Sequence, residues 1–137
     1  MSLPEWVDFQ LSKDLPILRA RGESQDLEYM ESFPQNVREL SKEIAAFASS
    51  NQGTILIGVS DVGDLVGLEN AEDFSRRDEL LRRIEGVCSG TINPSITPIV
   101  KFCIEENKVV LAILVPKGSQ PIYYSHHIPY VRHITQS

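Results

Sequence analysis

The 137-residue sequence has little that would place it outside the cell or in a membrane. Its two cysteines, Cys88 and Cys103, are too few for a disulfide framework, and we expect both to be free thiols. No apolar run approaches the roughly 18–20 residues that are needed to cross a bilayer. The start, MSLPEWVDFQ, lacks the basic and apolar regions of a signal peptide. These absences predict a cytoplasmic protein.

The sequence also lacks the basic excess of a dedicated nucleic-acid binder. The net charge is −6, and the deficit is concentrated in residues 1–69, which hold 5 Lys or Arg against 12 Asp or Glu. Residues 70–137 hold 8 against 7. Because phosphate neutralisation supplies much of the affinity for DNA or RNA, any such role must depend on a local basic patch or on metal ions.

Several catalytic motifs are missing as well. The sequence has no GxxxxGK[ST] phosphate-binding loop and therefore no helicase motor, and it has no G-x-S-x-G nucleophile elbow. His126 and His127 are adjacent in a polar turn, but no cysteine pair stands at the spacing of a zinc site. These absences exclude the commonest types of ATPase, hydrolase and zinc site as interpretations of the sequence.

What the sequence does have is a regular alternation of strand and helix patterns. Val37, Leu40, Ile44 and Phe47 recur at helical spacing, while TILIGVS is an apolar run of strand length that predicts a central strand covered on both faces. A second helix is expected to turn Phe74, Leu80 and Ile84 inward. The expected elements are a strand at 27–30, a helix at 36–49, strands at 54–60 and 65–68 around the turn 61–64, a helix at 71–87, a loop at 91–98, two strands within 99–116, and one or two short strands in 121–134.

This order, β-α-β-β-α-β-β-β, predicts an α+β domain with a mixed or antiparallel sheet covered by two main helices. We expect residues 1–22 to form an N-terminal arm or short helix, and residues 23–137 to form the domain itself. No internal repeat or low-complexity linker interrupts the chain.

Acidic residues are crowded just before the first strand. Glu23 and Glu28 are five residues apart, so neither a continuous helix nor a continuous strand brings them together, but a bend ahead of Leu27 would. Asp61, at the end of the apolar strand, is the natural third member. Three converging carboxylates need a cation or raised pKa values, and Mg²⁺ or Mn²⁺ prefers such hard oxygen ligands. The alternative is that these side chains are simply solvated in a loop, a strand edge and a turn.

Other side chains are candidates for contacting nucleic acid. The second helix carries Arg76, Arg77, Arg82 and Arg83, which could bind phosphates or could pair with the interleaved acidic residues on a wet surface. Arg132 is suited to bidentate phosphate contact. Tyr130, with Tyr123 and Tyr124, could stack on bases or could be half-buried strand residues.

Four stretches together resemble the Schlafen AlbA-like domain family. They are ESQDLEYM, LSKEIAAFASSNQGTILIGVSDVGDLVGL, VVLAILVPKGSQPIYY and PYVRHI, and the similarity runs from about Glu23 to Arg132. The resemblance implies a DNA- or RNA-binding module of bacterial transcriptional regulators and helicase-related proteins. It also implies that the 137 residues are excised from a longer chain with further domains.

In family members that cleave RNA, an acidic triad binds a divalent ion. The resemblance assigns this triad to Glu23, Glu28 and Asp61, with Asp64 as the fallback for the third position. The family pattern places a lysine where this chain has Met30, which removes a cation from the site. Binding without cleavage is equally compatible with the resemblance.

Three hypotheses follow. The leading one is a nucleic-acid-binding module that uses Arg76, Arg77, Arg82, Arg83, Arg132 and Tyr130. The second is a metal-dependent endoribonuclease that uses Glu23, Glu28 and Asp61 with Mg²⁺ or Mn²⁺. The third is a protein-interaction or homodimerisation domain.

Overall fold

The structure, a computed structural model, describes residues 3–132. Within this range the chain is an α+β fold, as the sequence predicted, built from three helices and two sheets. The helices are α1 (Phe9–Arg21), α2 (Arg38–Ser50) and α3 (Phe74–Gly90). No helix of these residues is both long and apolar enough to span a bilayer.

The larger sheet has the strand order β1-β2-β5-β4. β1 runs parallel to β2, and the other two pairings are antiparallel. A smaller antiparallel sheet has the order β3-β6-β7. The larger sheet consists of β1 (Leu27–Met30), β2 (Gly53–Ile57), β4 (Ile99–Glu105) and β5 (Lys108–Val115), and the smaller one of β3 (Ile92–Asn93), β6 (Tyr123–Ser125) and β7 (Ile128–Tyr130).

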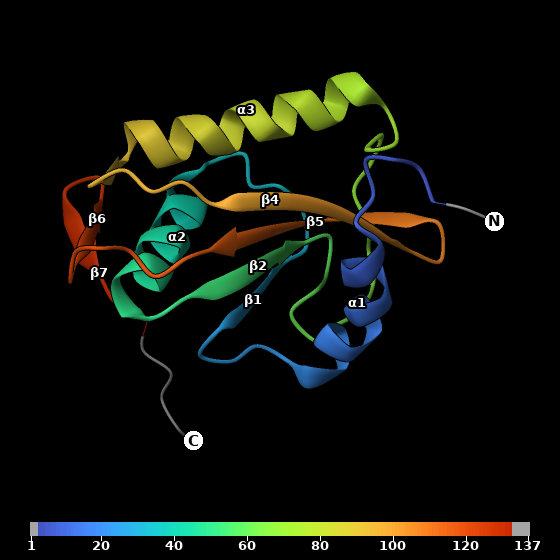
Figure 1. Ribbon diagram of the computed structural model, residues 1–137, viewed down its shortest axis with the longest axis horizontal. Helices are drawn as coiled ribbons and strands as arrows, with labels where there is room; N and C mark the ends of the chain where they lie inside the picture. The colour runs from blue at the N-terminus through green and yellow to red at the C-terminus, as the bar shows by residue number, and fades with distance from the viewer. Residues whose placement is uncertain (1–2, 133–137) are drawn as a thin grey trace.

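Helices cover both faces of the larger sheet. α2 and α3 pack on the face that carries Ile55 and Leu111, whereas α1 packs on the opposite face against Leu27 and Leu56. Figure 1 shows α3 along one side of the sheet and α1 on the other. Because β2 and β5 lie between two layers of helix, their side chains are almost all apolar and buried, which confirms the predicted central strand.

The segment predicted as a strand at 65–68 is not a strand. Only a single bridge, between Val59 and Leu65, joins it to the preceding segment. Gly58 and Gly67 both adopt positive φ, at 115° and 83°, and the amide groups of Val66 and Gly67 both donate to the carbonyl oxygen of Gly58. Glycine permits these turns, which an extended strand could not contain. The chain therefore coils at this point instead of returning along β2.

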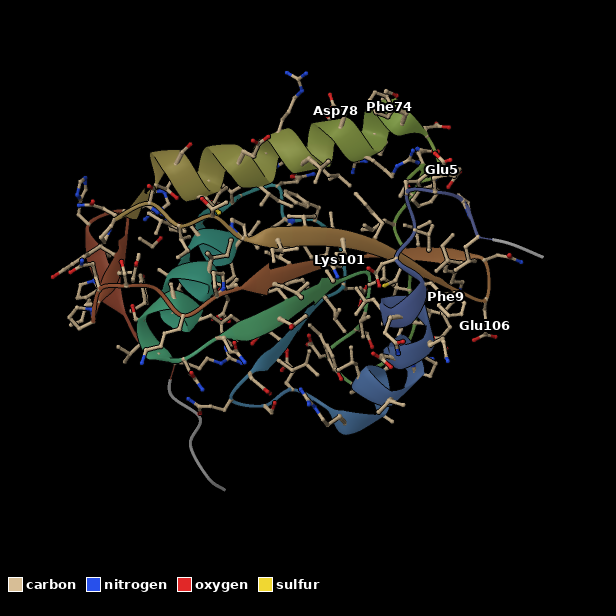
Figure 2. All side chains as sticks on the ribbon, viewed as in Figure 1. Glu5, Phe9, Phe74, Asp78, Lys101 and Glu106 are labelled. Carbon is tan, nitrogen blue, oxygen red and sulfur yellow. The ribbon has the colours of Figure 1, made fainter. Side chains whose placement is uncertain are left out.

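Two further expectations were wrong in detail. Phe74, predicted to face inward, begins α3 with 74% of its surface exposed, and Figure 2 shows it on the outer side of that helix with Asp78. The predicted loop at 91–98 contains the short strand β3, which pairs with β6. β3 has only two residues, and its register depends on a partner distant in the sequence, so local pattern carries little signal for it.

The N-terminal segment covers the free edge of β4. The amide of Asp8 donates to the carbonyl oxygen of Phe102 over 2.7 Å, and Val7 forms a parallel bridge with the same residue. Two residues farther along the edge, the amide of Ile104 donates to the Ser12 hydroxyl over 3.0 Å. Residues before and within α1 therefore satisfy polar groups that β4 would otherwise present to solvent.

Gly53 allows α2 and β2 to approach each other closely. A Cβ atom at this position would lie 2.1 Å from the ring of the fully buried Phe47. Gly53→Ala is expected to lower the free energy of unfolding by about 1–3 kcal/mol, because a packed ring must move. Gly86→Ala is the control, since nothing lies within 4 Å of a Cβ there and alanine favours the helix. Urea unfolding measures both variants, and equal stability of the two would contradict this account.

Candidate functional site

The chain bends sharply just before β1, as the acidic cluster required. Ser24 and Leu27 exchange backbone hydrogen bonds of 2.9 and 3.4 Å, which closes a tight turn between them. Glu23 then lies alongside β1, where its carboxylate accepts a hydrogen bond from the amide of Tyr29 over 3.0 Å. The turn brings the Glu23 and Glu28 side chains into contact with each other.

The side chain that organises these carboxylates is Arg132. Its guanidinium lies 3.0 Å from Glu28 and 3.3 Å from Glu43, and it is 8% exposed. It also donates to the carbonyl oxygens of Ser24 and Leu27, over 2.8 and 3.4 Å. Arg132 therefore contacts two acidic side chains and secures the turn that precedes β1.

Two further contacts hold Arg132 against α2. Its guanidinium lies over the ring of Phe47, with the carbon 4.6 Å from the ring centroid, and its amide donates to the Ser50 hydroxyl over 2.5 Å. Glu43 and Phe47 are one helical turn apart and so lie on the same face of α2. On this face, Glu43 and Phe47 together hold the planar guanidinium of Arg132.

The carboxylates outnumber the cation, and this imbalance shifts the protonation of Glu28. Burial, the adjacent Glu23 carboxylate and the charge of Glu43 raise the pKa of Glu28 from 4.5 to about 8, against the lowering effect of Arg132. Glu28 can therefore hold a proton near neutral pH.

Asp61, the expected third member, does not join this cluster. β1 and β2 run parallel, so Glu28 lies beside Ile55, whereas Asp61 follows the far end of β2 in an exposed turn. Asp64, the fallback, is exposed in the same turn, where its amide donates to the Ser60 hydroxyl. The third carboxylate near Glu28 is Glu43, which sequence reasoning missed. It lies in the middle of α2, and nothing in the sequence links this helix face to Glu28.

This arrangement does not fit a magnesium or manganese ion. The Arg132 guanidinium contacts Glu28 and Glu43 directly, which is where a metal would need open oxygen ligands. Residues 3–132 contain no group of three His, Cys, Asp or Glu side chains that could hold a metal ion. The acidic cluster is therefore an ion network in which an arginine of the chain occupies the place of a metal ion.

The arginines of α3 are engaged in different ways. Arg76 pairs with Glu79, and Arg82 pairs with Asp78 over 2.8 Å on the outer surface of the helix, where Figure 2 shows the Asp78 side chain. Arg77 is buried, lies 3.9 Å from the Trp6 ring centroid and donates to the carbonyl oxygen of Ala71.

Arg83 lies over the Phe33 ring at 4.5 Å and donates to the carbonyl oxygen of Pro34. Together with Arg77, it therefore serves the packing of the fold. Whether any of the four α3 arginines contacts nucleic acid stays a prediction.

A polar pocket of about 700 Å³ lies where the smaller sheet meets the ends of two helices. Arg38, at the start of α2, lines it together with His126 and His127 from the β6–β7 turn. The end of α3 and the strand β3 supply the rest of its wall, and none of its lining residues is acidic. Sequence reasoning considered the two histidines only as zinc ligands and did not single out Arg38 as their neighbour.

The three tyrosines near this pocket differ in exposure. Tyr123 is buried in the core, Tyr130 is half-buried with the Lys42 amine 5.8 Å from its ring centroid, and Tyr124 is 38% exposed on the outer face of β6. Tyr124 lines a second pocket, which shares Ser95 with the polar one. Of the three, Tyr124 is therefore best placed to meet a ligand.

Comparison with known proteins identifies the family. The family model described as Schlafen, AlbA_2 matches residues 23–137. The chain belongs to the Schlafen AlbA_2 family. No curated protein matches its sequence.

Solved structures share the fold of this Schlafen AlbA_2 chain. One is the solution NMR structure of the N-terminal domain of a Nitrosomonas europaea protein described as ATP-dependent DNA helicase RecG-related, at 23% identity and a TM-score of 0.60. That match covers 92% of this chain and 89% of the other. The DIP2311 protein from Corynebacterium diphtheriae matches at 19% identity and a TM-score of 0.52, over 85% of this chain and 24% of the DIP2311 chain.

Removal of Arg132 should be costly to the fold. Arg132→Ala leaves Glu43 without its buried cation and removes the clamp on the turn before β1, so we expect a loss of about 3–5 kcal/mol in the free energy of unfolding. Arg82→Ala, on the surface of α3, should change it by less than about 0.5 kcal/mol. Chemical unfolding of both variants checks the difference, and similar midpoints would show that the buried cation is dispensable.

Stability should also depend on the proton of Glu28. Because its folded pKa of about 8 lies above the ordinary 4.5, the stability contributed by the proton is complete below about pH 4.5 and is lost as the pH rises through 8. Glu28→Gln keeps a neutral group at this position at every pH. The melting temperature of the variant minus that of the wild type should therefore increase as the pH rises across this window.

Glu39→Gln, on the exposed surface of α2, is the matched control and should show no such trend. The comparison needs only melting curves at a series of pH values. A constant difference between Glu28→Gln and the wild type would rule out a proton on Glu28.

Proposed function

We propose that this chain is a nucleic-acid-binding domain that contacts phosphate groups through the polar pocket at the smaller sheet. The observation that carries the proposal is the lining of this pocket, in which Arg38, His126 and His127 converge without an acidic residue. The chain as a whole has a net charge of −6, so a phosphate backbone can approach only where the local charge is reversed. The pocket is such a place.

The other arginines support this choice of surface by being engaged elsewhere. Arg132 is enclosed by Glu28 and Glu43, and Arg77 is buried against Trp6. Arg82 is exposed and Arg76 partly exposed at the surface, but each already has a carboxylate partner on α3. Among the arginines of the described chain, only Arg38 lines the pocket that has no acidic neighbour.

Exposed Tyr124 favours single-stranded nucleic acid over a duplex. It lies on β6, in register with Asn93 of β3, and it lines the pocket that adjoins the polar one through Ser95. Bases of a single strand can stack on such an aromatic ring while the adjacent phosphate enters the basic pocket, and this stacking tolerates any base sequence.

The proposed role is binding within a longer protein. The matched Nitrosomonas europaea domain is the N-terminal part of a helicase-related protein, and this likeness supports a similar place for the present chain. Cleavage is not part of the proposal, because Asp61 lies apart from Glu23 and Glu28, and Arg132 is seated among the carboxylates. A role in a transcriptional regulator is equally compatible with a binding domain.

Binding is expected to depend on Arg38. Fluorescence anisotropy with labelled single-stranded DNA and RNA oligonucleotides, at low salt, should show binding that weakens steeply as salt is added. Arg38→Gln should weaken it several-fold and reduce the slope of log affinity against log salt by about one.

Arg82→Gln is the matched control, because it removes the same charge from an exposed helix position outside the pocket. The control should bind as the wild type does. Absence of binding to any oligonucleotide would overturn the proposed function. A larger effect of Arg82→Gln than of Arg38→Gln would move the binding surface to α3, as the sequence first indicated.

A further inference from the structure

A chain of three hydroxyl groups, two of them buried, leads into the polar pocket. Ser41 of α2 lies 2.7 Å from the Thr91 hydroxyl, just beyond the end of α3, and 2.5 Å from the Ser125 hydroxyl of β6. Thr91 donates in turn to the carbonyl oxygen of Val87 over 2.7 Å, and Ser125 lies 3.1 Å from Nδ1 of His126. Ser41 is fully buried and Ser125 is 2% exposed, so the contact between these two hydroxyl groups is closed to water, whereas Thr91 and His126 at the two ends of the chain are partly exposed.

The number of protons in this chain fixes the state of His126. The contacts Thr91–Val87, Ser41–Thr91, Ser41–Ser125 and Ser125–His126 are four hydrogen bonds, and each needs one proton. The three hydroxyl groups supply three protons, and the carbonyl oxygen of Val87 supplies none. The fourth proton must therefore be on Nδ1 of His126, which donates to Ser125.

The backbone holds this ring in place. His126 and His127 form the two-residue turn between β6 and β7, both with positive φ, at 50° and 71°. The amide of His126 donates to the carbonyl oxygen of Thr91 over 2.9 Å. With its amide and Nδ1 both engaged, the neutral ring has only the lone pair of Nε2 left to offer the pocket that it lines.

We infer that His126 is a proton-linked ligand for a phosphodiester, with its tautomer set by the Ser125–Ser41–Thr91 hydroxyl chain. The inference rests on the proposed function, and it identifies how the same pocket is regulated. When a phosphate oxygen enters, Nε2 takes up one proton from solvent and donates it to that oxygen as a hydrogen bond. Nδ1 keeps its own proton on Ser125, so no other group has to change state.

The bound phosphate is what drives this proton uptake. A neutral Nε2 presents a lone pair, which repels an anionic oxygen, whereas the protonated ring provides both charge and a donor. The ionisable groups that face it in the pocket are Arg38 from α2 and the adjacent His127; the cation of Arg38 attracts the phosphate but opposes a second positive charge, so the proton is taken up together with the anion. α3 ends at the same pocket, and the C-terminal end of a helix favours a nearby cation.

The tautomer can be measured on the free protein. Long-range ¹⁵N–¹H NMR of the neutral imidazole should show the proton of His126 on Nδ1. Ser41→Ala removes one acceptor and frees the Ser125 proton to donate to His126, so this variant should shift the ring toward the Nε2–H tautomer. Ser60→Ala removes a hydroxyl outside the chain and should leave the tautomer unchanged. A wild-type ring protonated on Nε2 would overturn the inference.

The coupling between phosphate binding and proton uptake by His126 must be tested with a ligand whose own charge does not change with pH. Dimethyl phosphate meets this condition, and its binding can be followed by NMR in a His127→Gln background, in which His126 is the one histidine among residues 3–132 that still lines the pocket. Affinity should rise roughly three- to tenfold from about pH 7.5 to about pH 5.5. His126→Gln, added to this background, should remove that dependence, because glutamine can donate but does not titrate.

A pH dependence that survives His126→Gln would overturn the linkage. The two proposals fail in different experiments, because the tautomer is measured without any ligand. Loss of oligonucleotide binding with His126 still protonated on Nδ1 would overturn the proposed function. Oligonucleotide binding with the opposite tautomer would overturn only the inference about His126.

Discussion

The fold depends above all on one guanidinium enclosed by carboxylates. Arg132 is the last described residue, yet its side chain contacts α2, β1 and the turn before β1. These elements lie roughly a hundred residues away in the sequence, so the ion network joins the end of the described chain to its N-terminal part. Because Glu23, Glu28 and Glu43 together exceed the charge of one arginine, the network stays negative even when Glu28 holds a proton. The cluster that the sequence presented as a metal site is thus completed by the chain's own cation.

α2 links this network to the polar pocket. Near its start, Arg38 and Ser41 serve the pocket and the buried hydroxyl chain; farther along, Glu43, Phe47 and Ser50 hold Arg132. β7 runs from the pocket's histidine turn to Arg132, and so connects the same two features along the other side. The smaller sheet therefore has few degrees of freedom relative to α2. A ligand in the pocket would contact residues of α2 and the smaller sheet, whose positions are fixed by the hydroxyl chain and by the contacts of Arg132.

The sequence predicted those parts of the fold that local pattern determines. The period of Leu40, Ile44 and Phe47 specified α2, and the apolar run after Gly53 specified β2, because burial on one or both faces leaves a direct mark on composition. The bend before Leu27 was also predicted, from the need to bring Glu23 toward Glu28. The third carboxylate was assigned to Asp61 in place of Glu43, because the choice depends on which helix face packs over β1, and this is a tertiary property. His126 was likewise visible as a residue beside Ser125, but the hydroxyl groups that continue the chain, Ser41 of α2 and Thr91 just beyond α3, are connected to it by no local spacing.

The family match begins at residue 23, whereas the cover on the β4 edge comes from Val7, Asp8 and Ser12. The edge of β4 is thus covered by residues that lie outside the region matched by the family model. A chain begun at residue 23 would present the amide of Ile104 and the carbonyl oxygen of Phe102 to other molecules, and exposed strand margins of this kind recruit further strands. In this protein the residues before and within α1 therefore occupy the strand edge at which another chain could add a strand.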